Sequence, residues 1–406
     1  MNLMKRIFAI LLVLIMFLSG CAKNSANPKI VTFWTLQMGD FAPYINSIIQ
    51  NYENEHKNIR IKWVDVPFSE GEKRTLAAVM TDFPPDLINL NPDFSAILAQ
   101  KGTLWKIDKT NLVDFNQEIV HAMEYNGESY SIPWYATSAI TIYNKDLFNK
   151  SGLLRLPKTY DELAAVAEKI KANTGAYAYL PTITENDTML KIMNKYGISE
   201  ISDYNSAKSI KLFNMFKKMY QKDLIPAESI TLTHREALEQ YMAGKIVFYQ
   251  GGANFLNMIK ENAPKIYEQT DVAEQIKGSV GQNDFSVMNF VIPLKAKNKQ
   301  EALDFCLYLT NEENQLELAK MTNIITTNEN ALNDEFYNDK TDLVAKARSI
   351  SAKQINRITP QVVQRRNQKE INFQINSAVQ SALLNKDSVE NLVESLYKNC
   401  KKLDVD

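Results

Sequence analysis

The chain has 406 residues, of which 45% are hydrophobic and 23% are charged, and its formal net charge is −1 at pH 7. This length exceeds what one ordinary hydrophobic core supports, so the sequence predicts two domains of a soluble globular protein. The near-neutral charge and the lack of a basic block argue against nucleic acid as a partner.

The first residues have the pattern of a secretory signal. Lys5 and Arg6 precede an apolar run at 7–18, which is shorter than the roughly 20 residues that a membrane-spanning helix needs. The run ends in the letters LSGC, which resemble the lipobox of bacterial lipoproteins. That resemblance implies removal of residues 1–20 and lipidation of Cys21, followed by a polar tether at 21–29. A signal peptide that happens to meet a cysteine, or a short uncleaved anchor, remains an alternative.

The next segment alternates strand and helix patterns. A buried strand is expected at 30–34, followed by an amphipathic helix whose apolar positions recur from 41 to 52. A second strand is expected at 58–66, a helix near 70–81 and a third strand within 83–91. This alternation favours a parallel sheet with helices on its faces.

The stretch SIPWYATSAITIYNKDLF, residues 131–148, places a proline and two aromatic residues directly before a strand. Thr159 is a plausible N-cap of the following helix, with Glu162 at the spacing of a capping box. Apolar periodicity predicts further helices at 187–196, 206–221, 234–243, 298–320 (broken near Thr310) and 341–404 (interrupted at Pro360). A strand, a turn and the start of a helix are expected at 245–255, and a strand at 285–294.

Two cysteines follow Cys21. Cys306 shares a helical face with apolar neighbours, which predicts a core thiol, and Cys400 is ninety-four residues further along. A disulfide between Cys306 and Cys400 is possible, although no spacing indicates it.

Five stretches of the chain resemble, in the same order, stretches of the extracellular solute-binding proteins of bacterial ABC importers. They are IVTFWTLQ, FPPDLINLNPDFSAILAQKGTLWKID, YNGESYSIPWYATSAITIYNKDLFNKSGL, YMAGKIVFYQGGANF and KAKNKQEALDFCLYLTNEENQ. The resemblance is to the cluster that includes maltose-binding-type sugar receptors, and it covers nearly all of the chain after the signal. Two departures leave the subfamily and ligand open: few glycines in SVMNFVIPLKAKN, and Tyr160 where the family often has Trp.

The resemblance implies an α/β fold of two lobes, each a mixed, mainly parallel sheet flanked by helices, joined by hinge crossovers. Residues 30–132 and 285–330 would form lobe one, and residues 133–284 and 331–406 lobe two. The segment YSIPWYATS would be the first crossover, with Pro133 fixing the backbone where the chain changes lobe. The ligand would bind between the lobes, and its binding would close them.

A sugar site needs flat aromatic faces and planar hydrogen-bonding groups, which the ends of the expected strands supply. The candidate ligand-binding residues are Trp34, Gln37, Asp40, Asn91, Asp93, Trp134, Tyr135, Tyr249, Gln250, Asn254, Asp284 and Arg365. Several have structural alternatives: core packing for Trp34, helix capping for Asp40 and Asp93, loop solvation for Gln37, and a solvated face for Arg365.

No catalytic motif accompanies this pattern. The three histidines suggest no shared site, although a pair of catalytic carboxylates can come from anywhere in a sequence. The resemblance therefore implies capture of a small solute, with a mono- or oligosaccharide expected, for an ABC permease, at the outer face of the cytoplasmic membrane or in the periplasm. No metal or organic cofactor is expected. The alternatives are a non-sugar solute such as a polyamine, glycerol phosphate or peptide, a lipoprotein that serves a sensor, and an anchored glycan-processing enzyme.

Overall fold

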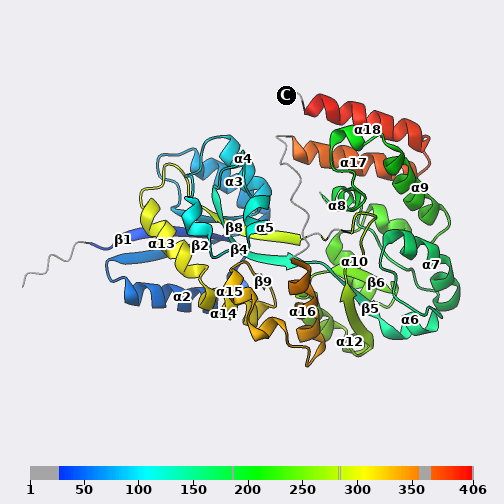
Figure 1. Cartoon of the computed structure of the whole chain (residues 1–406), viewed down its shortest axis with the longest axis horizontal. Helices are drawn as coiled ribbons and strands as arrows, with labels where there is room; N and C mark the ends of the chain where they lie inside the picture. Colours follow the sequence, from blue (N-terminus) through cyan, green and yellow to red (C-terminus); the bar gives the residue numbers. More distant parts are fainter. Residues whose placement is uncertain (1–26, 185–186, 282, 284, 356–366, 405–406) are drawn as a thin grey trace, which may run out of the picture.

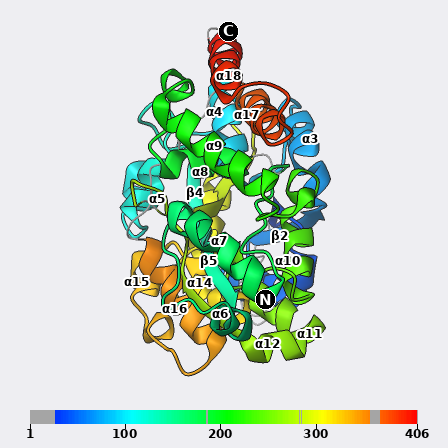
Figure 2. The same cartoon turned by 90° about the vertical axis from the view of Figure 1, so that its right-hand side faces the viewer.

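The computed structural model describes residues 27–184, 187–281, 283, 285–355 and 367–404, without the side chains of residues 40, 68 and 69. The chain forms two α/β lobes that lie side by side, with helix α16 (Leu343–Ile355) between them (Figure 1). The two-lobed α/β fold is therefore confirmed. Seen along the line that joins the lobes, the helices of lobe two lie in front of lobe one (Figure 2).

Lobe one is built on a six-stranded sheet of the described residues, in the order β2-β1-β3-β8-β4-β9. Its strands are β1 (Lys29–Leu36), β2 (Ile59–Val66), β3 (Leu87–Leu90), β4 (Ser131–Ser138), β8 (Phe285–Val291) and β9 (Ile325–Thr326). Strand β1 runs parallel to β2 and β3, whereas β8 is antiparallel to β3 and β4, and β4 is antiparallel to β9.

Both faces of this sheet are covered. Along β1, Val31 and Phe33 point into one apolar cluster, while Leu36 points into another, as the two-residue period of a strand requires. Phe33 packs edge-on against Phe290 and Phe305, with ring centroids 5.8 and 5.4 Å apart. The helices of lobe one are η2 (Gly39–Phe41), α2 (Ala42–Glu55), α3 (Phe68–Val79), α4 (Pro92–Gln100), η3 (Lys109–Leu112), α5 (Gln117–Ala122), α13 (Lys299–Leu309), α14 (Glu312–Thr322), α15 (Glu329–Leu332) and η6 (Glu335–Tyr337).

Lobe two has a smaller sheet of described strands, in the order β6-β5-β7, with both pairings antiparallel. The strands are β5 (Ile140–Asn144), β6 (Phe248–Gly251) and β7 (Thr270–Glu274). Its helices are α6 (Lys145–Lys150), α7 (Tyr160–Thr174), α8 (Thr188–Lys195), η4 (Ile201–Asp203), α9 (Ala207–Gln221), η5 (Ala227–Ile230), α10 (His234–Met242), α11 (Phe255–Asn262), α12 (Pro264–Gln269), α17 (Gln368–Leu383) and α18 (Val389–Leu403).

Three details of the expected architecture are wrong. The sheets are not mainly parallel: β8 returns from lobe two and enters the first sheet antiparallel to its neighbours, and both described pairings of the second sheet are antiparallel. The chain leaves lobe one at Ala139 and not at Pro133, because Pro133 still pairs with Asn289 inside the six-stranded sheet. Tyr337, expected in lobe two, is buried in lobe one, where its hydroxyl donates to the carbonyl of Ile324.

Several local predictions are confirmed. Thr159 is the N-cap of α7, where its hydroxyl accepts from the backbone N–H of Glu162, and α13 ends at Leu309 with Thr310 as its C-cap. Cys306 is fully buried in the core of lobe one and Cys400 is buried in lobe two, so the two do not form a disulfide with each other. The expected interruption at Pro360 lies outside the described residues.

Three segments cross between the lobes. The first is the step from β4 to β5 at Ala139, and the second runs from β7 back to β8 through 275–284. The third contains α16, which contributes Ala347 to a cluster of lobe two and Ile355 to the main core of lobe one. These crossings are the places where the lobes can rotate relative to each other.

The second crossing packs closely on α8 at Gly278. A Cβ added there would overlap the carbonyl oxygen of Lys195, which also accepts from the backbone N–H of Val280 at 3.1 Å. We expect Gly278→Ala to lower the free energy of unfolding by about 1 to 3 kcal/mol, because either the crossing or α8 must shift. Thermal denaturation measures this loss. The exposed neighbour Ser279 is the control, and equal melting temperatures for Gly278→Ala and Ser279→Ala would contradict the prediction.

Candidate functional site

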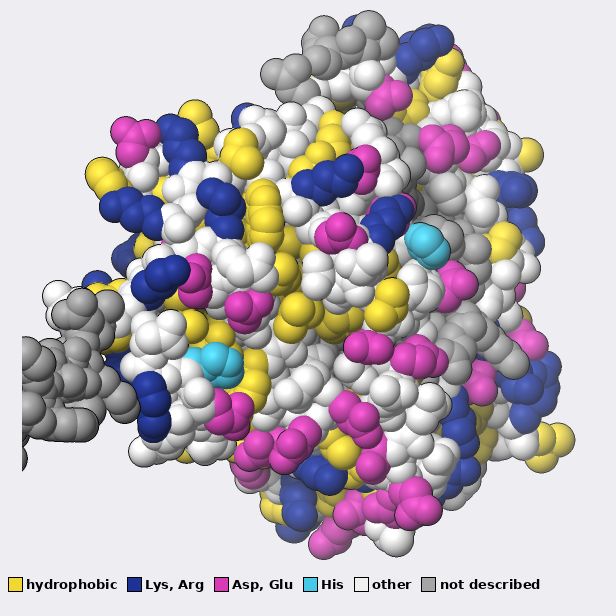
Figure 3. Space-filling model, turned by 60° about the vertical axis from the view of Figure 1, so that its left-hand side comes forward, with side chains coloured by type: hydrophobic (Ala, Val, Ile, Leu, Met, Phe, Trp, Pro, Cys, Tyr) yellow, Lys and Arg dark blue, Asp and Glu magenta, His cyan; other side chains and the backbone are white. Residues whose placement is uncertain are grey.

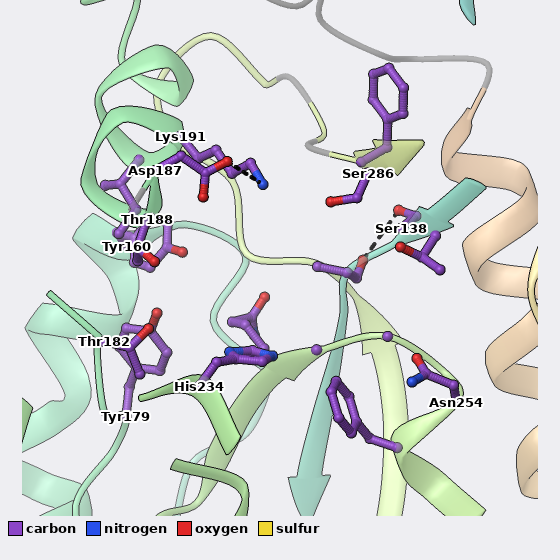
Figure 4. Close-up of a pocket in the computed structure, with 18 residues that line it drawn as sticks. Ser138, Tyr160, Tyr179, Thr182, Asp187, Thr188, Lys191, His234, Asn254 and Ser286 are labelled. Atoms are coloured by element: carbon purple, nitrogen blue, oxygen red, sulfur yellow. Dashed lines mark hydrogen bonds and ion pairs between the residues drawn. The ribbon is translucent and has the colours of Figure 1, made fainter. Parts of the chain in front are cut away.

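A cavity of about 410 Å³ lies where the first two crossings meet lobe two (Figure 4). Its lining from the lobe-one sheet comes from the end of β4 and the start of β8, including Ser138 and Ser286. The rest of the lining belongs to lobe two, and its side chains are Tyr160, Tyr179, Thr182, Asp187, Thr188, Lys191, Ile192, His234, Gln250, Asn254 and Phe255. The volume lies in the range of about 300 to 1,000 Å³ that small-molecule sites occupy.

Four helices of lobe two begin at this cavity. Tyr160 and His234 are the first residues of α7 and α10, Asp187 precedes α8, and Asn254 precedes α11. The first backbone N–H groups of a helix lack intrahelical partners and carry partial positive charge. The cavity is therefore suited to electron-rich oxygen atoms of a ligand.

His234 lies at the centre of the lower wall in the close-up view (Figure 4). Its Nε2 atom is 2.7 Å from the hydroxyl oxygen of Tyr249, a hydrogen bond that either group can donate. The ring also packs against Phe255, with centroids 5.5 Å apart. The capping box of Thr233 and Glu236 fixes the start of α10, and thereby the backbone from which His234 projects.

Two of the predicted ligand residues line the cavity, Gln250 and Asn254. Gln250 already uses both ends of its amide within the protein. Its Oε1 accepts from the backbone N–H of Ile276 at 3.0 Å, and its Nε2 donates to Thr141 Oγ1 at 2.9 Å. Tyr249, a third predicted residue, is 2% exposed and lies behind His234 instead of on the cavity surface.

Trp134 and Tyr135, the aromatic pair expected at the cleft, lie in strand β4. Trp134 is completely buried, and its ring packs on Phe290 at 4.6 Å and on Tyr135 at 5.0 Å between centroids. Burial raises the pKa of Tyr135 to about 12. Neither side chain lines the cavity.

The remaining described candidates lie at the carboxyl ends of β1 and β3. Trp34 is partly buried against the second core of lobe one, and Gln37 is exposed with φ = 52°. Asn91 caps α4 by accepting from the N–H of Phe94 at 2.8 Å, and Asp93 lies in the first turn of that helix. The capping role expected of Asp93 therefore belongs to Asn91. These four residues do not line the cavity.

This end of lobe one nevertheless faces lobe two. Glu72 of α3 forms an ion pair with Lys369 of α17, across the two lobes. The neighbouring Gly71 packs on the side chain of Leu36, at the end of β1. Trp34 and Gln37 are therefore near the rim where the lobes touch. The side chain of Asp40 and all of Cys21, Asp284 and Arg365 lie outside the described residues.

The described cavity lining carries little net charge. Apart from His234, its ionisable acid and base are Asp187 and Lys191, which form an ion pair at 2.8 Å. On the face in Figure 3, Lys and Arg side chains are interspersed with Asp and Glu. Among the described residues no group of three or more His, Cys, Asp or Glu side chains could hold a metal ion. Within the same residues, no helix is long and apolar enough to cross a membrane.

Sequence reasoning missed His234, Tyr160, Tyr179, Thr182 and Thr188. Tyr160 and His234 each follow a threonine that begins a helix, and this signal was available from the sequence. Tyr179 and Thr182 lie between α7 and α8, where no periodic pattern marks them.

Comparisons with known proteins agree with this geometry. A family model described as bacterial extracellular solute-binding protein matches residues 47–345. A multiple sugar-binding protein of Streptococcus mutans is 24% identical over 322 residues, which are 72% of this chain and 75% of that protein.

Among solved structures, a candidate oligosaccharide periplasmic-binding protein from Synechococcus sp. MITs9220, in complex with zinc, superposes with a TM-score of 0.83 at 26% identity. The match covers 92% of this chain and 99% of that one. Maltose-bound MalE3 of T. maritima superposes with a TM-score of 0.74 at 20% identity, over 92% of this chain and 99% of that one. The chain belongs to the bacterial extracellular solute-binding protein family.

Proposed function

We propose that this protein captures a neutral mono- or oligosaccharide in the cavity at the crossings and delivers it to the permease of an ABC importer. The observation that carries the proposal is the composition of the cavity lining. The lining combines hydroxyl and amide groups from Ser138, Thr182, Ser286 and Asn254 with the rings of Tyr160, Tyr179, Phe255 and Phe285, while its described carboxylate and ammonium group form an ion pair. Sugars offer hydroxyl groups and apolar C–H faces, which such a lining complements.

The same lining disfavours two other solutes. A polyamine needs several unpaired carboxylates, and the described lining has only Asp187, which is paired with Lys191. A phosphate group is favoured by the four helix starts but meets no arginine among the described lining residues. The relatives whose names state a sugar, including the Streptococcus mutans protein, support a saccharide for this chain.

The family places the mature chain outside the cytoplasm. We propose that Cys21 carries a lipid anchor, because the segment before it has the lipobox pattern. Acyl chains contribute about 0.8 kcal/mol per buried methylene, so two or more would hold the protein on a membrane. The tether 21–29 would then separate the lobes from the bilayer surface.

A ligand panel tests the proposed solute. Residues 22–406 are expected to melt at higher temperature with at least one neutral saccharide, because a ligand at 100 times its Kd adds about 2.7 kcal/mol of stability. Spermidine and glycerol 3-phosphate are measured in parallel. Stabilisation by either of these, with none by mono- and oligosaccharides, would reject the saccharide and keep the receptor fold.

A further inference from the structure

The three crossings between the lobes are joined by one buried glutamine, Gln354, near the end of α16. Its side chain is 4% exposed. Its Nε2 donates to Ser138 Oγ at 3.0 Å and to the carbonyl oxygen of Ala139 at 2.9 Å, both on the first crossing. Its Oε1 accepts from the backbone N–H of Gln275 at 2.8 Å, on the second crossing.

The backbone of the same residue makes a further bond. The carbonyl oxygen of Gln354 accepts from Asn283 Nδ2 at 3.1 Å, at the far end of the second crossing. Gln275 Nε2 in turn donates to Ser138 Oγ at 3.3 Å. We call Ser138, Gln275, Asn283 and Gln354 the hinge cluster. All four are buried, so each bond that is lost leaves a polar group without water to replace it.

The hinge cluster is continuous with the cavity wall. Ser138 belongs to both. Gln250, which also lines the cavity, accepts from the backbone N–H of Ile276, the residue after Gln275. Lys195 extends the connection to α8, because its Nζ donates to Gln275 Oε1 and to the carbonyl of Ile276, both at 2.9 Å. A change in how the crossings are held must therefore change the cavity wall.

We propose that Gln354 is a positioning residue for ligand binding: it touches no ligand, but it holds the three crossings in one arrangement so that the cavity wall is ordered before the ligand arrives. The inference rests on the proposed ligand site and adds what fixes its geometry. Without the amide, the lobes sample more orientations, and the ligand must order them at a cost in affinity.

Gln315 supplies a matched control. It is also a buried glutamine, 1% exposed, and its Oε1 accepts from the backbone N–H groups of Thr327 and Asn328, while its Nε2 donates to Thr327 Oγ1. These bonds stay within lobe one, away from the crossings. Replacing either glutamine with methionine, which has a similar length, removes comparable hydrogen bonds from a buried site.

The experiment measures three quantities for wild type, Gln354→Met and Gln315→Met: the melting temperature, the Kd of the saccharide that stabilises wild type most, and the radius of gyration from small-angle scattering without ligand. Both variants are expected to have a lower melting temperature than wild type. Only Gln354→Met is expected to bind the saccharide at least about fivefold more weakly than wild type, which lies within the usual range of coupling between sites. Only this variant is also expected to have a larger radius of gyration than wild type.

Equal Kd and equal radius for wild type and Gln354→Met would overturn the proposal, as would the same Kd change in Gln315→Met. If no saccharide binds wild type, the proposed function fails separately, and the scattering comparison alone decides on the hinge cluster. If Gln354→Met does not fold, Gln354→Glu takes its place, because it keeps the acceptor for the N–H of Gln275 and loses the donor to Ser138 and Ala139.

Discussion

Replacing Trp134 with alanine is expected to lower the free energy of unfolding by about 3 to 5 kcal/mol, the usual loss for a buried tryptophan. The side chain is completely buried in β4 and packs on Phe290 and Tyr135. Its removal leaves a cavity in the main core of lobe one, which the surrounding close-packed side chains fill only in part. Chemical denaturation measures the loss.

Two further variants serve as comparisons for Trp134→Ala. Trp134→Phe is expected to cost much less than Trp134→Ala, because it keeps most of the ring and removes an indole N–H that has no hydrogen-bond partner in the described structure. Trp105→Ala, at a partly exposed position of the same lobe, is also expected to cost less. A Trp134→Ala protein of unchanged stability but weakened ligand binding would show instead that Trp134 stacks on the ligand.

Replacing His234 with alanine is expected to raise the Kd of the bound saccharide by about tenfold, which corresponds to about 1.4 kcal/mol. The imidazole forms part of the cavity wall, and its hydrogen bond to the buried Tyr249 hydroxyl fixes the orientation of the ring. A hydrogen bond to a ligand hydroxyl together with the lost ring contact accounts for a loss of this size. Isothermal titration calorimetry measures it.

His121 is the control for this substitution, because its exposed side chain lies on lobe one, away from the cavity. His121→Ala is expected to bind as wild type does. Tyr249→Phe is expected to weaken binding less than His234→Ala, because the imidazole ring of His234 remains in the cavity wall and only loses the hydrogen bond that orients it. An unchanged Kd in His234→Ala would place the ligand elsewhere.

The sequence predicted the elements of the fold well, because hydrophobic periodicity and capping are local properties. The strand at 30–34, the helix over 41–52 and the cap at Thr159 all correspond to observed elements. The order of strands in the sheet is a long-range property. The antiparallel entry of β8 depends on a segment that returns from lobe two, and no local pattern at 285–291 states its direction.

The candidate site was harder to predict for the same reason. Trp134 and Tyr135 are residue types that often bind sugars, yet Trp134 is completely buried at an irregularity in the pairing of β4 with β8, which no local sequence pattern marks. Gln250 and Asn254 were predicted because they follow a strand, and both line the cavity. His234 was not predicted, because its approach to Tyr249 depends on how α10 packs against β6.

The most direct measurement of the central claim is an isothermal titration of residues 22–406 with neutral saccharides. The account predicts saturable heat with one site per chain for at least one saccharide, and a weaker Kd for the same saccharide in His234→Ala. No heat from any saccharide, together with saturable binding of a polyamine or of glycerol 3-phosphate, would contradict it.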